Sequence, residues 1–277
     1  MNPHDYCQDK AAKSGSSFYY SFMFLPSERR QAITALYAFC REVDDVVDEC
    51  HDLSLAQTKL EWWRQEVGRV YGGTPTHPVG HALKDVIKGF RLPQEQLLEI
   101  IDGMAMDLSQ TRYLDFKGLQ LYCYRVASVV GLLAAEIFGY QDRQTLKYAH
   151  DLGLAFQLTN IIRDVGEDAR RGRIYLPIED LQRFKVPAKD LLEARYSDAF
   201  RELMAFHAER AVKFYDQAFA QLPAIDRKAQ RPGLVMAAIY RTLLREIAAD
   251  GFLVLDRRTS LTPLRKVWLA GTTWFRA

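Results

Sequence analysis

Two clusters of acidic residues at helical spacing constrain this chain more than any other feature. In the first, Arg41–Glu49, five carboxylates occur within eight residues, and valines are interleaved with them. Asp44, Asp45 and Asp48 are three or four positions apart, so on a helix they share one face. Like charges at that spacing repel by about 0.2–0.5 kcal/mol per pair. Such a face is therefore either solvated or directed at a cation.

A second cluster lies 116 residues further along the chain. Its polar residues Gln157, Asn160, Asp164 and Asp168 again form one stripe of a helix, at positions i, i+3, i+7 and i+11. Two such stripes favour a shared cation site over two separate solvated faces. Antiparallel helices with short connections could bring both stripes to the same end of a bundle, where bundles build their metal sites.

The composition is that of an ordinary globular protein of 277 residues, with 48% hydrophobic and 26% charged residues. The net charge of +2 and the lack of a Lys/Arg block argue against a nucleic-acid partner. The four cysteines form no metal-binding pair and indicate a reducing compartment. The N-terminus has no signal-peptide core, and no apolar run approaches the roughly 20 residues that span a bilayer. We therefore expect a cytoplasmic protein.

No segment shows the alternating pattern of a β-strand, and the helical periodicity predicts one all-α domain over residues 1–277. We expect residues 1–15 to be a flexible N-terminus. We expect residues 256–277 to be a basic tail that carries Trp268, Trp274 and Phe275. The predicted helices cover residues 27–49, 54–71, 79–90, 94–109, 116–138, 142–165, 178–184, 188–195, 197–221 and 226–249.

The predicted helix over residues 116–138 is nearly uncharged, which is typical of a helix at the centre of a bundle. Its small residues Ala127, Ser128 and Gly131 leave room beside it. Close packing of another helix would use that room, and so would the wall of an apolar cavity. The sequence leaves both interpretations open.

The ligands offered by the two stripes are carboxylates and an amide, without a nearby His or Cys. Hard oxygen ligands suit Mg²⁺, with Mn²⁺ as the alternative. Because proteins usually hold Mg²⁺ with a few carboxylates plus substrate phosphates, this site predicts a phosphate ligand. Arginines match phosphate oxygens, or they could merely neutralise the acids. They adjoin both clusters, at Arg41, Arg163, Arg170, Arg171 and Arg173.

An apolar, aromatic-rich interior next to such a site describes a ligand with a diphosphate head and a hydrocarbon tail. Departure of diphosphate from an allylic carbon generates a carbocation. The faces of Tyr20, Phe22 and Tyr124 could stabilise that cation by about 0.5–2 kcal/mol each, and core packing is their alternative role.

On these motifs the chain resembles the squalene/phytoene synthase family, the head-to-head isoprenyl diphosphate synthases. The resemblance covers essentially the whole chain past residue 15. The matching stretches are Ser16–Tyr19, Leu36–Arg41, Val43–Asp48, Tyr122–Ala127, Gly131, Gln157–Asp168 and Arg173–Pro177.

The resemblance implies an all-α isoprenoid synthase type I fold with two farnesyl diphosphates in a central apolar cavity. It implies Mg²⁺ ligands at Asp44, Asp48, Asn160, Asp164 and Asp168, with Asp45 as an additional candidate. It implies that Tyr124 and Tyr175 face the reacting centre. The substrate contacts that it implies are Ser16, Ser17, Tyr20, Phe22, Arg41, Gln157, Asn160, Arg163, Arg173 and Tyr240.

Within the family, the chain is most similar to bacterial presqualene diphosphate synthases of hopanoid pathways. That likeness implies condensation of two farnesyl diphosphates to presqualene diphosphate, a step that needs no NADPH, followed by squalene-forming enzymes as downstream partners. The alternatives are a phytoene, dehydrosqualene or squalene synthase and, more remotely, a non-catalytic helical assembly factor. The basic tail from Arg265 to Phe275 suggests peripheral contact with the inner membrane face, and ordinary helix packing is its alternative.

Overall fold

The computed structural model describes residues 2–13, 17–50 and 52–276, which contain helices and no β-strand. The helices, with a π-helical turn η1 and a 3₁₀ turn η2, are α1 (Pro3–Lys13), α2 (Ser17–Phe22), α3 (Ser27–Glu49), α4 (Leu53–Gly72), α5 (Pro78–Gly89), α6 (Gln94–Ser109), α7 (Phe116–Cys123), η1 (Tyr124–Ser128), α8 (Val129–Phe138), α9 (Gln144–Arg170), α10 (Ile178–Arg183), α11 (Ala188–Leu192), α12 (Asp198–Gln221), η2 (Ala224–Asp226), α13 (Arg231–Ala249) and α14 (Pro263–Arg276). The predicted all-α fold is confirmed.

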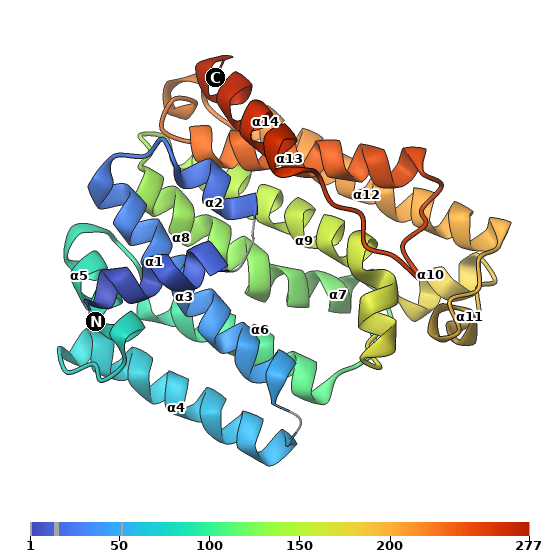
Figure 1. Ribbon diagram of the computed structural model, residues 1–277, viewed down its shortest axis with the longest axis horizontal. Coiled ribbons are helices and arrows are strands. Elements are labelled where there is room, and N and C mark those ends of the chain that lie inside the picture. The colour runs from blue at the N-terminus through green and yellow to red at the C-terminus, as the bar shows by residue number, and fades with distance from the viewer. Residues whose placement is uncertain (1, 14–16, 51, 277) are drawn as a thin grey trace.

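Two apolar clusters make up the core. One is built mainly from α1 to α6 and α8, and the other mainly from α7, α9, α12 and α13 (Figure 1). Helices α8 and η1 pack against α9 and so join the two halves. This arrangement leaves space for a cavity between the halves, lined from both sides.

The central segment from Phe116 to Phe138 is interrupted by the π-helical turn, where the Val129 N–H bonds to the Tyr124 carbonyl. Both interpretations of its small residues hold. A Cβ on Gly131 would lie 2.5 Å from the Ala149 carbonyl oxygen, so the helices touch there. Ala127 and Gly131 also line the cavity.

Phe116–Phe138 is also the one stretch, among the described residues, that is long and apolar enough to cross a membrane by length and composition. Our expectation that no segment approaches that length was wrong. The segment lies between α6 and α9, which is where a core helix of a bundle lies.

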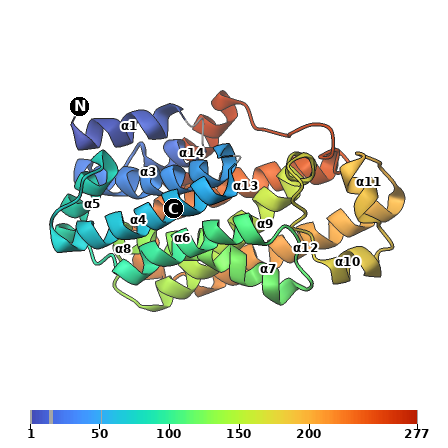
Figure 2. The same cartoon turned by 90° about the horizontal axis from the view of Figure 1, so that it is seen from below.

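The N-terminus also differs from our prediction, because Pro3–Lys13 form helix α1 and are not a flexible tail. Figure 2 shows α1 lying along the outside of α3. Cys7 is buried, and Lys10 pairs with Glu42 at 3.0 Å and with Asp45 at 2.8 Å. These contacts tie α1 to the back of the first acidic cluster.

The basic tail folds back on the bundle, in agreement with ordinary helix packing, the alternative given for it above. Helix α14 packs against α13 and α2, and Leu261 and Ala270 are buried. Residues 258–261 and part of α14 therefore reach the central cavity, although nothing in their local pattern predicts this.

Candidate active site between two acidic helix ends

A cavity of about 850 Å³ lies between the two halves of the bundle. Apolar side chains from α2, α3, α8, α9 and α13 form one part of its lining, among them Phe22, Leu36, Phe138 and Phe156. Both acidic clusters stand at one end of the same cavity, so the predicted meeting of the two stripes is found in the structure. An apolar chamber with a charged end suits an amphipathic ligand.

In the first cluster Arg41 bridges two carboxylates. Its guanidinium lies 2.6 Å from Asp44 and 2.6 Å from Asp45. Burial raises the pKa of Asp44 to about 6, and this side chain lines the cavity. Asp45 is outside the lining and also pairs with Lys10 of α1, so it is not placed as a cavity ligand. Successive residues of a helix point about 100° apart, so Asp44 can face the cavity while Asp45, the next residue, faces α1.

In the second cluster Asp164 is held by two arginines. Arg163 donates to it at 2.7 Å and Arg258, from the C-terminal segment, at 2.8 Å. Although burial disfavours its charge, the hydrogen bonds from Arg163 lower the pKa of Asp164. Burial and then the charge of Asp164 raise the pKa of Asp168 to about 8.

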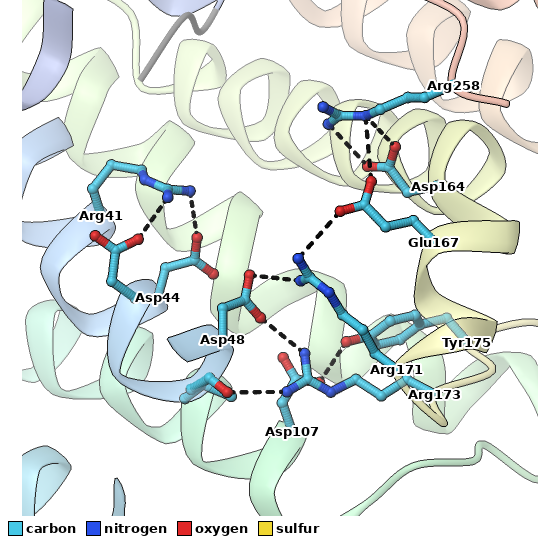
Figure 3. A network of polar contacts seen from close by, with 12 residues as sticks. Arg41, Asp44, Asp48, Asp107, Asp164, Glu167, Arg171, Arg173, Tyr175 and Arg258 are labelled. Atoms are coloured by element: carbon cyan, nitrogen blue, oxygen red, sulfur yellow. Dashed lines mark hydrogen bonds and ion pairs between the residues drawn. The ribbon is translucent and has the colours of Figure 1, made fainter. Parts of the chain in front are cut away.

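Asp48 connects the two clusters (Figure 3). It accepts from Arg171 at 3.0 Å and from Arg173 at 3.0 Å, and Arg171 also pairs with Glu167 at 3.2 Å. The short segment after α9 is fixed next to the connector before α7, where the Ile174 N–H donates to the Thr111 carbonyl at 3.0 Å. The arginines therefore reach across the cavity mouth from a rigid base.

A buried carboxyl–phenol network lies further inside. Asp107 accepts from Tyr175 at 2.7 Å and from Tyr122 at 2.9 Å. Burial raises the pKa of Asp107 to about 6 and keeps both phenols in their neutral form, because it raises their pKa values too. All three residues line the cavity. Asp107 lies on the buried side of α6, and Tyr122 begins the stretch Tyr122–Ala127 that matches the family, in which the resemblance implied a role only for Tyr124.

Most of the predicted site residues line this cavity. Phe22, Gln157, Asn160, Arg163, Arg173, Tyr175 and Tyr240 are all part of the lining, together with Arg41, Asp44, Asp48, Asp164 and Asp168. Asn160 donates to Gln157 at 3.2 Å, while its own buried carbonyl oxygen has no hydrogen-bond partner among the described residues.

Besides Asp45, two predicted residues, Tyr124 and Tyr20, lie outside the lining. Tyr124 is not part of the lining, and its ring centroid lies 5.8 Å from that of His150. The π-helical turn shifts the phase of the helix, so that Tyr122 and Val126 face the cavity instead.

Tyr20 is also outside the lining, because α2 turns Phe18 and Phe22, four positions apart, toward the cavity. Of the remaining predicted contacts, Ser16 lies outside the described residues. Ser17 begins α2, and its side chain is not described.

The donor set fits Mg²⁺ only in combination with a second source of oxygen atoms. The unpartnered carbonyl of Asn160 is a hard ligand on the same stripe as Asp164 and Asp168. Yet no group of three or more His, Cys, Asp or Glu side chains in the described part of the chain converges as a metal site. Asp44, Asp48 and Asp164 are each paired with an arginine, and diphosphate oxygens are the ligands that would complete such a site.

Comparison with known proteins agrees with this geometry. The chain is 36% identical to a phytoene synthase of Arthrospira platensis over 99% of its length and 93% of the relative's. A dehydrosqualene synthase solved with a ligand superposes with a TM-score of 0.90, at 31% identity over 99% of this chain and 96% of that one. The squalene synthase HpnC of Alicyclobacillus acidocaldarius superposes with a TM-score of 0.81, at 28% identity over 90% and 94% of the two chains. The squalene/phytoene synthase profile matches residues 11–265, and the chain belongs to that family.

Proposed function

We propose that this protein condenses two farnesyl diphosphates head to head into presqualene diphosphate. The observation that carries the proposal is one apolar cavity with two acidic, arginine-bearing helix ends at the same end. Each helix end offers carboxylates and a guanidinium, so the mouth has the charge pattern to receive two diphosphates. The hydrocarbon tails would then lie side by side among the apolar residues.

The arginines would bind the diphosphates by exchanging partners. Arg41, Arg163 and Arg173 now pair with carboxylates at 2.6 to 3.0 Å, and each guanidinium fork also fits phosphate oxygens. Mg²⁺, or Mn²⁺, would be held by Asp44, Asp48, Asn160, Asp164 and Asp168. When bound it neutralises charge that builds up on a departing diphosphate.

The proposed reaction joins two farnesyl diphosphates and releases one diphosphate and one proton. The C1–O bond of one farnesyl diphosphate breaks and its electron pair leaves with diphosphate. The 2,3-double bond of the second molecule supplies the pair for the new C–C bond, and loss of one proton closes a cyclopropane. The second diphosphate stays on the product. No reductant is consumed, so NADPH has no part in this step.

The inner part of the cavity protects the cation. Phe18, Phe22 and Phe156 are among its aromatic walls, and a bound hydrocarbon tail packed against them would keep water from capturing the cation. The Asp107 carboxyl fixes the hydroxyls of Tyr122 and Tyr175 by accepting a hydrogen bond from each. These hydroxyls are held at defined positions where they can orient the reacting double bond.

Phytoene synthase is the second candidate, because a curated relative 36% identical over nearly the whole chain bears that name. The likeness to a squalene synthase called HpnC and to a dehydrosqualene synthase supports the farnesyl substrate instead. A presqualene product would require a downstream reductive, squalene-forming enzyme as a partner in the pathway.

The test is to incubate the purified protein with Mg²⁺ and either farnesyl or geranylgeranyl diphosphate, with and without NADPH, and to identify the products by mass spectrometry. We expect presqualene diphosphate from farnesyl diphosphate under both conditions, with one diphosphate released per two substrates. Formation of phytoene from geranylgeranyl diphosphate would contradict the presqualene proposal and identify the protein as a phytoene synthase. Release of no diphosphate from either substrate would mark a non-catalytic protein.

A further inference from the structure

Helix α1 presents one polar edge to the C-terminal half of α3. Tyr6 and Lys10, four positions apart, lie on that edge. The Tyr6 hydroxyl donates to Glu42 at 2.7 Å. The Lys10 ammonium pairs with Glu42 at 3.0 Å and with Asp45 at 2.8 Å. In the described part of the chain, Lys10 is the only cation that pairs with Glu42. Lys10 therefore offsets the charges of two acids that α3 places three positions apart, where like charges repel.

The place of α1 in the fold does not depend on these ion pairs. The helix packs against α3 and α5, and its residues Cys7 and Ala11 are buried. The Tyr6 ring also meets the His77 ring edge-on, with 5.5 Å between their centroids. Because apolar and aromatic contacts hold the helix, a substitution of Lys10 should leave α1 in place.

Charges of alternating sign lead from Lys10 to the cavity. The two carboxylate oxygens of Asp45 have different partners, since Oδ2 lies 2.8 Å from Lys10 Nζ and Oδ1 lies 2.6 Å from Arg41 Nη2. The other terminal nitrogen of Arg41, Nη1, lies 2.6 Å from Asp44. The Asp45 side chain is only 17% exposed, so solvent screens this chain of contacts in part. Arg41 and Asp44 line the cavity, whereas Lys10 and Asp45 lie outside the lining.

This arrangement decides how readily Arg41 can turn to an anion. A diphosphate that binds Arg41 would take Nη1 from Asp44, while Asp45 keeps hold of Nη2. With Lys10 present, Asp45 divides its charge between two cations, so Arg41 is held in position without being held too strongly. Without Lys10, Asp45 would attract Arg41 alone, and the unbalanced acids behind it would repel an incoming anion. Both effects would weaken diphosphate binding.

We propose that Lys10 is a positioning residue for diphosphate binding, which acts through Asp45 on Arg41. The inference rests on the proposed function in one respect, that Arg41 binds a diphosphate. It does not depend on which prenyl product is formed. Helix α1, which lies outside the cavity, would in this way contribute to the affinity of the site.

The test measures two quantities in the presence of Mg²⁺, the kinetics with farnesyl diphosphate and the Kd of inorganic diphosphate by titration calorimetry. Lys10→Gln should raise both KM and this Kd by about threefold to fivefold, with kcat within about twofold of the parent, because the lost interaction concerns binding. Lys10→Arg keeps the charge and should restore most of the affinity. Unfolding in urea checks that the variants are folded.

Lys13→Gln is the matched control. It removes the same charge from the same helix, but Lys13 is exposed and has no ion-pair partner among the described residues. Its KM and Kd should equal those of the parent, because an exposed charge is screened.

A double variant distinguishes positioning from a purely structural role. If Lys10 acts through Asp45, then Lys10→Gln should change the Kd by less than about twofold once Asp45→Asn has been made. An equal loss of affinity in both backgrounds would overturn the proposal. So would parental affinity in Lys10→Gln, or a Lys10→Arg variant that restores nothing. A parent that binds inorganic diphosphate but turns over no prenyl substrate would contradict the proposed function alone, since the calorimetric comparison still decides the role of Lys10.

Discussion

Arg173 lies 3.0 Å from Asp48, although the two residues are 125 positions apart in the sequence. The ion pair joins the segment after α9 to the C-terminal end of α3. A second hydrogen bond runs from Arg173 to the Val47 carbonyl at 3.3 Å. Arg171 repeats the link to Asp48 from a more exposed position. These contacts hold the two acidic helix ends at a fixed separation across the cavity mouth.

Replacing Arg173 should weaken the site more than replacing Arg171. Arg173→Gln loses both the Asp48 pair and the carbonyl contact, and we expect kcat/KM to fall by about 10²-fold. Arg171→Gln should cost about tenfold or less, since an exposed charge is screened. Steady-state diphosphate release measures both. Arg201→Gln is the matched control, because its only described partner is the nearby exposed Asp198. A larger loss for Arg171→Gln than for Arg173→Gln would contradict this order.

Asp44 and Asp164, two of the aspartates that line the cavity, should matter more for turnover than Asp45, which lies outside the lining. Asp44→Asn and Asp164→Asn should each lower turnover by about 10²-fold or more, because each removes a charge at the diphosphate end. Asp45→Asn should cost less than about tenfold, since Asp45 faces Lys10 of α1.

Metal removal should abolish the activity as well. After treatment with a chelator we expect diphosphate release to stop, and Mg²⁺ in excess should restore it to the parent but not to Asp44→Asn or Asp164→Asn. The readout is diphosphate release before and after Mg²⁺ is added back. Undiminished activity in the chelator would refute the assignment of these acids as Mg²⁺ ligands.

The metal-free protein should become less stable as the pH rises from 6.5 to 8. The pKa of Asp168 is about 8 in the folded protein and 3.8 in the unfolded chain. Between these two values the folded state binds more protons than the unfolded state, so the free energy of unfolding falls as the pH rises. His207 acts in the opposite sense, but only below its unfolded pKa of 6.5, because its folded pKa is about 4. Urea denaturation at several pH values measures the slope. Asp168→Asn should flatten it, and an unchanged slope in that variant would show that another group titrates.

Close packing between η1 and α9 should make Gly153 intolerant of a side chain. A Cβ there would lie 2.6 Å from the Ala127 carbonyl oxygen, which is backbone and cannot move away freely. We expect Gly153→Ala to lower the free energy of unfolding by about 1–3 kcal/mol. Gly68→Ala in α4 is the control, because no atom lies within 4 Å of its Cβ position. That exposed substitution should raise the stability by up to about 1 kcal/mol through helix propensity.

Much of the helical framework follows from local pattern. The helix predicted over residues 94–109 matches α6, and the acidic cluster ends α3 as expected. Helix α4 begins at Leu53, one residue before the predicted start, and Asp52 caps it by accepting the N–H groups of Ser54 and Leu55. Asp and Ser both cap helices well, so the sequence alone does not tell which of Asp52 and Ser54 is the cap.

The sequence by itself determined the two acidic stripes, because helical spacing places residues three and four apart on one face whatever surrounds them. Only the tertiary structure decided which members of each stripe meet. Asp45 turns to α1, a π-helical turn exchanges Tyr124 for Tyr122 at the cavity, and Arg258 arrives from the C-terminal segment to hold Asp164. Each of these outcomes depends on contacts between distant segments or on a shift of helical phase. Local periodicity contains no information about either.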